Sequence, residues 1–189
     1  MNENRNDTTK WLQYLLYVGI ASLVNSLLGI FGLGGLSRWI GLVVNGATIY
    51  LLFMLAGSNP RYKTAAIFFA VALVSGLISN VILGLVGSIC GIVAQYQEYH
   101  AHGELIEERD PKLADQWGTL FGLEILVSIV AVLLTGLVVG VLAAATNISE
   151  AAILPVATIL VAALGIALNA LYLSYLNRTI KLLENEFVE

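Results

Sequence analysis

The chain has 189 residues, of which 58% are hydrophobic and 12% are charged, and its mean hydropathy is +0.85. Soluble domains usually carry about 25% charged residues, so this composition excludes an ordinary soluble globular protein. The formal charge of −4 at pH 7 argues against nucleic-acid binding, which requires a basic surface. Cys90 is the single cysteine, which excludes an intramolecular disulfide and a cysteine-rich metal site.

Long uncharged runs separate the charged residues. Five of these runs exceed the roughly 18 residues that mark a membrane-spanning candidate. We therefore predict an all-α polytopic integral membrane bundle, a single domain with about five transmembrane helices. The approximate spans are 11–30, 37–56, 64–94, 120–145 and 152–176, followed by an amphipathic tail over 177–189.

Turn residues set the ends of the first two spans. The glycine-rich segment 31–35 and the Gly-Ser-Asn-Pro segment 57–60 are both typical of turns. No breaker follows over 64–109, and a continuous helix of that length would measure about 69 Å, more than twice the roughly 30 Å hydrocarbon core. Asp110 as N-cap and Pro111 at the first helical position begin the next helix. The third and fourth helices should therefore form a protruding hairpin with an extramembrane tip over 95–119.

The orientation is weakly determined by Lys and Arg. Five spans with the C-terminus inside give 5 of these residues inside and 4 outside, with the N-terminus opposite the C-terminus. A re-entrant first helix would instead give 7 inside and 2 outside. The hairpin tip and the C-terminal tail should share one side, with the 146–150 connection on the other. The tip side should also carry an aromatic belt of Trp39, Tyr96, Tyr99, Trp117, Phe121, Tyr172 and Tyr175.

Asparagines lie near the middle of four of the five predicted spans. They are Asn25, Asn45, Asn80 and Asn169. Amides avoid lipid, so we expect these side chains to point into the bundle. They either form hydrogen bonds between helices or make a polar seam that binds a substrate or ion near the midplane, as in transporters. No ionisable residue lies at a span centre, and Glu124 is expected at the membrane interface.

Small residues recur at helical spacing in the third and fourth spans. This pattern lets helix backbones approach closely in a membrane. The candidate packing residues are Gly76, Gly84, Ser88, Gly87, Gly91, Gly136 and Gly140. The spacing leaves open whether the partner helix belongs to the same chain or to a second copy.

The predicted hairpin tip is acidic. Residues 98–115 contain six acidic side chains and two basic ones, for a net charge of −4. The candidate residues for docking a partner are Glu98, His100, His102 and Glu104. Their two one-turn Glu–His pairs lie on different faces of a helix, unlike the ligands of a single-helix metal site. We therefore predict no catalytic residue, metal site or cofactor.

The segment from Tyr96 to Leu105, followed by Asp110-Pro111 and Gln116-Trp117, resembles functionally uncharacterised multi-pass membrane proteins of gut Firmicutes. The resemblance is strongest over the hairpin tip. It implies a bacterial plasma membrane and supplies no catalytic residue, substrate or partner.

These observations favour a non-enzymatic plasma-membrane protein that contacts the lipid bilayer and presents the acidic hairpin to a partner. The partner would be a membrane protein, a cytoplasmic protein or a second copy of the chain. The alternative is a small transporter or channel that uses the asparagine seam. A membrane-embedded enzyme using His100 and His102 is a third hypothesis, and it would require a concave site around them.

Overall fold

Six helices make up the regular structure of the described chain. The structure is a computed structural model that describes residues 2–31, 33–78, 80–146 and 150–185, with side chains described except at 2–6, 134–135 and 137–158. The helices are α1 (Asn2–Ile30), α2 (Gly34–Leu55), α3 (Pro60–Leu77), α4 (Val81–Glu104), α5 (Pro111–Thr146) and α6 (Glu150–Glu184). All except α3 are long and apolar enough to cross a membrane. The prediction of an all-α membrane bundle with about five transmembrane helices is confirmed.

The third predicted helix is divided in two, which corrects the expectation of an unbroken helix over 64–109. The chain leaves helical geometry at Ile78, and Asn80 then caps α4 by accepting hydrogen bonds from the backbone N–H groups of Ile82 and Leu83 at 2.9 and 3.2 Å. Asparagine is among the best N-cap residues, so it can begin a helix without a preceding glycine or proline. Helices α3 and α4 consequently fold back on each other as an antiparallel pair.

Helix α3 is short, but it too presents an apolar face outward. Its uncharged part, 64–77, is about 21 Å long at 1.5 Å per residue, against a hydrocarbon core of roughly 30 Å. Ile67, Val71, Val74 and Leu77 are exposed on one side of it. This face indicates that α3 contacts lipid along with the five longer helices.

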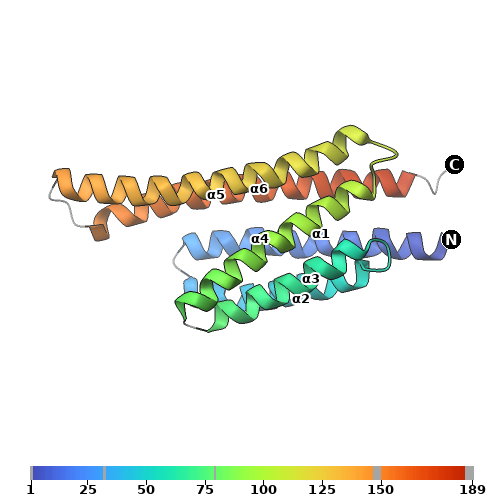
Figure 1. Cartoon of the computed structure of the whole chain (residues 1–189), viewed down its shortest axis with the longest axis horizontal. Helices are drawn as coiled ribbons and strands as arrows, with labels where there is room; N and C mark the ends of the chain where they lie inside the picture. The colour runs from blue at the N-terminus through green and yellow to red at the C-terminus, as the bar shows by residue number, and fades with distance from the viewer. Residues whose placement is uncertain (1, 32, 79, 147–149, 186–189) are drawn as a thin grey trace.

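The helices form a closed ring in chain order. Each helix packs on its neighbours in the sequence, and α6 packs on α1 to close the ring. Figure 1 shows that Asn2, Glu184 and the 105–110 turn lie at one end of the bundle, here called the tip end. At the opposite end, the far end, α5 and α6 extend beyond the other four helices. The N-terminus therefore shares the tip end with the C-terminus, contrary to the five-span expectation, because the break at 78–80 adds a sixth pass along the bundle.

The buried core fills the tip end of the ring. Its largest side chains come from five different helices and include Leu12, Leu52, Tyr62, Trp117 and Leu176. Toward the far end, large apolar side chains face outward instead, among them Val43, Ile82 and Val132. Such a surface is compatible with lipid and not with water. The protein is therefore a multi-pass integral membrane protein.

Candidate functional site

A polar cavity of about 170 Å³ lies where all six helices meet. Its amide and hydroxyl groups come from Ser22, Asn45, Thr48, Gln95, Tyr99, Asn169 and Tyr172. Two carboxylates, Glu98 and Glu124, also line it, whereas none of its described lining residues is Lys or Arg. Ionisable groups inside a membrane bundle are costly to bury, and such groups frequently mark substrate or ion pathways.

Two tyrosine–glutamate pairs form the wall of this cavity at the tip end. Tyr172 donates a hydrogen bond of 2.7 Å from its hydroxyl to Oε1 of Glu98. Tyr99 donates one of 2.7 Å to Oε1 of Glu124. The two tyrosine rings are stacked with centroids 5.6 Å apart. The pairs therefore join α4, α5 and α6 across the cavity.

A buried histidine continues the network toward α3. His102 has no solvent exposure, and its Nε2 lies 3.6 Å from Oε1 of Glu98. Its other ring nitrogen, Nδ1, lies 2.8 Å from the hydroxyl of Tyr62. The ring of Trp117 packs against the imidazole at a centroid distance of 4.5 Å, and its indole N–H donates to Thr179. This aromatic layer closes the cavity from the tip end.

Neither carboxylate of the cavity has a strong cationic partner. Among the described residues, no Lys or Arg lies within ion-pair distance of Glu98 or Glu124. His102 is the neighbour that contributes positive charge to Glu98 when it is protonated. A carboxylate in a low-dielectric interior requires a proton or a cation to offset its desolvation. The cavity is therefore chemically suited to a cationic guest.

A second cavity continues from the first between α4, α5 and α6. Its volume is about 430 Å³, and it shares Gln95, Glu124 and Asn169 with the central cavity. Ser88 and Ser128 add hydroxyl groups to its wall. The shared residues join the two cavities, and apolar side chains such as Ile92, Ile125 and Leu168 make up much of the remaining lining.

The four predicted seam asparagines do not form one seam. Asn45 and Asn169 line the central cavity, and the Asn169 amide also donates to the Gly165 carbonyl. Asn25 lies between α1 and α2, where its backbone carbonyl accepts a hydrogen bond from Ser37 and its side-chain Oδ1 is buried without a hydrogen-bond partner. Asn80 is the cap of α4 and is exposed. Of the four, Asn25 and Asn169 are partly buried, whereas Asn45 and Asn80 are exposed, with Asn45 at the edge of the cavity.

At most of the predicted packing glycines whose surroundings are described, an added Cβ would meet open space. A Cβ built on Gly87 would lie 3.0 Å from the side chain of Ser75, so α3 and α4 approach closely there. The same test finds no atom within 4 Å at Gly76, Gly84, Gly91 or Gly136. Ser88 bonds within its own helix, to the Gly84 carbonyl. Gly140 lies outside the residues whose side chains are described.

Close glycine contacts also occur at two positions outside the predicted set. A Cβ on Gly19 of α1 would lie 2.7 Å from Leu173 of α6, and one on Gly103 would lie 3.2 Å from the Ala114 carbonyl of α5. The first joins α1 and α6, which the sequence alone does not place together, and the second joins α4 and α5 at the predicted hairpin.

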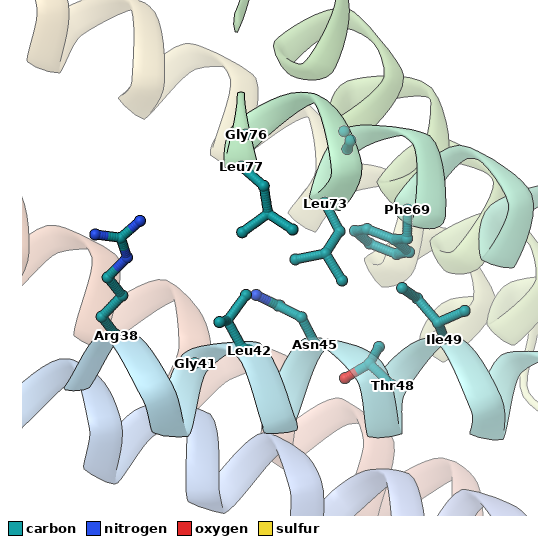
Figure 2. A pocket seen from close by; sticks show the side chains of 12 residues that line it. Arg38, Gly41, Leu42, Asn45, Thr48, Ile49, Phe69, Leu73, Gly76 and Leu77 are labelled. Carbon is teal, nitrogen blue, oxygen red and sulfur yellow. The ribbon is translucent and has the colours of Figure 1, made fainter. Parts of the chain in front are cut away.

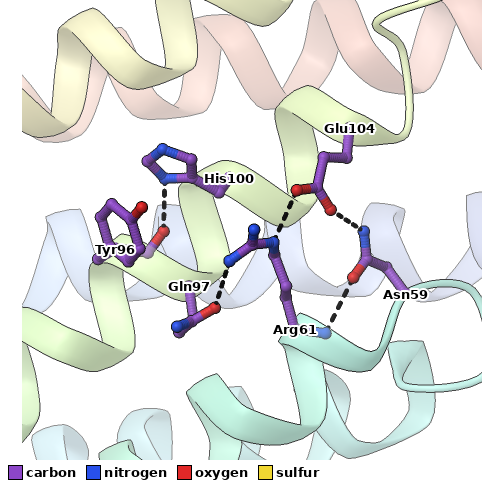
Figure 3. Close-up of polar contacts among 6 residues, drawn as sticks. All are labelled: Asn59, Arg61, Tyr96, Gln97, His100 and Glu104. Atoms are coloured by element: carbon purple, nitrogen blue, oxygen red, sulfur yellow. Dashed lines mark hydrogen bonds and ion pairs between the residues drawn. The ribbon is translucent and has the colours of Figure 1, made fainter.

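The predicted docking residues separate into two pairs. Glu98 and His102 are 4% and 0% exposed, so they are part of the internal network and do not reach a partner. Glu104 is exposed and His100 is half-buried. Glu104 accepts hydrogen bonds from Arg61 at 2.7 Å and from the Asn59 amide at 2.8 Å (Figure 3). The Nδ1 atom of His100 lies 2.9 Å from the Tyr96 carbonyl. These intramolecular contacts correct the expectation of a solvated acidic docking face formed by all four.

The sequence interpretation missed the role of Glu124 and of the tyrosines that hold the two carboxylates. Tyr99 and Tyr172 were expected in an interfacial belt, and the structure places them inside the bundle. Trp39, expected on the tip side, lies near the start of α2 at the far end and is 71% exposed.

No protein-family model, curated protein or solved structure matches the chain.

Proposed function

We propose that this protein is a small membrane carrier whose central cavity binds an organic ammonium ion. The observation that carries the proposal is the six-helix cavity with two carboxylates and no lining Lys or Arg. Phe69, Tyr99 and Tyr172 add aromatic rings to the wall. Carboxylates together with aromatic faces are the groups that recognise ammonium ions.

Access to the cavity is asymmetric, as a carrier requires. The aromatic layer and the buried core lie on its tip-end side, whereas the second cavity continues from it between α4, α5 and α6. Transporter sites commonly lie between helices that open to one side at a time. The described conformation corresponds to the state that is closed at the tip end.

The charge distribution supports a plasma-membrane orientation with the tip end in the cytoplasm. Of the nine Lys and Arg residues, Arg38 alone belongs to the far end. The eight at the tip end are Arg5, Lys10, Arg61, Lys63, Arg109, Lys112, Arg178 and Lys181. Cytoplasmic segments carry an excess of Lys and Arg, so both described ends of the chain face the cytoplasm and the second cavity lies toward the outer part of the membrane.

The binding test uses the full-length protein in detergent, with choline, methylammonium and the neutral choline isostere 3,3-dimethylbutan-1-ol. Ligand at 100 times its Kd stabilises a folded protein by about 2.7 kcal/mol, which raises the Tm of a chain of this size by roughly 5–10 °C. We expect a rise with at least one ammonium ion and none with the neutral alcohol. Glu98→Gln and Glu124→Gln should remove the rise, while Glu107→Gln, at an exposed site on the tip, should keep it.

Uptake of the bound ammonium ion into proteoliposomes then separates a carrier from a receptor. Binding without uptake would contradict transport and leave a membrane receptor. Equal stabilisation by the neutral alcohol, or full stabilisation of both glutamine variants, would contradict the site itself.

A second candidate function is docking of a membrane or cytoplasmic partner, or a second copy, on the acidic turn. The observation that favours it is the exposure of Glu107 and Glu108 between α4 and α5. Co-purification of a basic partner that is lost on double substitution to glutamine would support docking. Such a result would leave the cavity proposal unaffected, because neither residue lines the cavity.

A further inference from the structure

The groove between α2 and α3 is lined mainly by apolar side chains, and it shares Asn45, Thr48 and Phe69 with the central cavity. Its volume is about 450 Å³, and Figure 2 shows Leu42 and Ile49 on one wall facing Phe69, Leu73 and Leu77 on the other. Asn45 and Thr48 also line the groove, so an amide and a hydroxyl lie among the apolar side chains. A groove of this kind within a membrane bundle suits a hydrocarbon chain.

Arg38 lies at one end of the groove (Figure 2) and has no acidic side chain within ion-pair distance among the described residues. The neighbouring side chains Leu36, Trp39 and Val43 are 55%, 71% and 72% exposed. An exposed tryptophan beside a cation is typical of the boundary between hydrocarbon and headgroups. Arg38 therefore lies where a lipid phosphate can reach it.

The length of the groove matches one lipid leaflet. From Arg38 to Ile49 the helix advances eleven residues, or about 16 Å at 1.5 Å per residue. Half of a roughly 30 Å hydrocarbon core is about 15 Å. A headgroup at Arg38 would thus place its acyl chain along the full groove.

We propose that this groove binds one anionic phospholipid, with its phosphate on Arg38 and an acyl chain between α2 and α3. The guanidinium offers the planar pair of donors that phosphate accepts. The glycines of the groove make the room: a Cβ on Gly76 or Gly91 would meet no atom within 4 Å. The two carboxylates of the solute cavity lie outside this groove, whereas Asn45, Thr48 and Phe69 line both.

The test measures retained lipid by native mass spectrometry, and Tm in detergent, on adding phosphatidylglycerol or phosphatidylcholine to the full chain. We expect wild type to retain one phosphatidylglycerol and to be stabilised more by it than by phosphatidylcholine. Arg38→Gln should weaken phosphatidylglycerol binding roughly tenfold, which corresponds to about 1.4 kcal/mol. Arg38→Lys should retain part of the preference, because it keeps the charge without the planar fork.

A substitution that fills the groove provides the second part of the test. Gly76→Leu should abolish retention of the lipid, whereas Gly84→Leu, another open helical glycine that lies outside the groove, should leave it unchanged. Both substitutions replace a helical glycine by leucine, so their gain in helix propensity is matched. The Tm of each variant without lipid checks that it is folded.

Four outcomes would overturn the proposal. An unchanged preference for phosphatidylglycerol in Arg38→Gln would contradict the assignment of the phosphate to Arg38. Retention of lipid by Gly76→Leu would contradict the assignment of the acyl chain to the groove. An equal shift with glycerol phosphate alone would indicate a free-anion site without an acyl chain. Dissociation of a wild-type dimer on Gly76→Leu, without change in lipid, would assign the groove to a second copy of the chain.

Discussion

The cap of α4 gives the sharpest test of the fold. Asn80 accepts two backbone hydrogen bonds through one side-chain oxygen, at 2.9 and 3.2 Å. Loss of an N-cap typically costs about 1 kcal/mol, within a range of roughly 0.5–2 kcal/mol. The adjacent Val81 and Ile82 are 82% and 71% exposed, so this turn faces lipid and water cannot easily replace the cap. We therefore expect Asn80→Ala to cost about 2 kcal/mol.

That loss should lower Tm by roughly 4–8 °C for a chain of this size. Asn80→Leu should cost about the same as Asn80→Ala, because both remove the acceptor and the exposed site tolerates bulk. Asn80→Ser should retain most of the wild-type Tm, because serine caps helices nearly as well. Thermal unfolding in one detergent, with Asn169→Ser as a control for loss of an amide away from a helix cap, measures all of these. If Asn80→Ala lowered Tm only slightly and Asn80→Leu lowered it severely, the result would refute the cap and indicate tight interhelical packing at this site.

The other predictions concern helix packing and topology. Gly87→Ala should lower Tm because its Cβ would meet α3 at 3.0 Å. Gly84→Ala should raise Tm, because alanine adds up to roughly 1 kcal/mol of helix propensity at a position with open space around it. Equal shifts of Tm in the two variants would contradict the close approach of α3 and α4. In a Cys90→Ala background, cysteines at Asp7 and Glu108 should be labelled from the same side of the membrane and one at Phe31 from the other. Labelling of the first two from opposite sides would restore the five-pass arrangement.

The spans could be predicted because hydropathy determines them almost alone. Proline and its preceding cap residue also specified two turns correctly: Asn59 accepts from the Arg61 N–H before α3, and Asp110 accepts from the Leu113 N–H before α5. In both places the side-chain cap and the fixed backbone of proline act within four residues. The local sequence alone is therefore enough to predict these two turns.

The break at 78–80 could not be predicted in the same way. Ile78 and Asn80 occur inside an uncharged run without proline or an adjacent glycine, and either residue is tolerated within a helix. The break is favourable because α3 then packs closely on α4, with Ala72 and Ser75 directly against Gly87, which has no side chain. One undetected turn reverses the direction of the three preceding helices, α1 to α3, relative to the rest. With this turn included, Lys and Arg are distributed very unequally between the two ends of the bundle, whereas the five-span arrangement divides them almost evenly.

The carboxylate site was hidden for a related reason, since its groups are close in space and distant in sequence. Glu98 and Tyr172 are 74 residues apart, and Tyr99 and Glu124 are 25 apart. Each glutamate taken alone lies near the charged end of an apolar run, where an interfacial position is the simpler expectation. Only closure of the six-helix ring turns both of them inward.

The tyrosine bonds do not by themselves explain why these positions carry acids. In each pair tyrosine is the donor, and a glutamine Oε1 would accept the same hydrogen bond. Glutamine would also avoid the desolvation of a carboxylate inside the bundle. If the cavity served packing alone, Glu98→Gln and Glu124→Gln should therefore preserve or raise the Tm. A normal or raised Tm combined with lost ammonium binding would show that the ionisable oxygens serve the guest and not the fold, whereas a large loss of Tm in both variants would assign them to the structure.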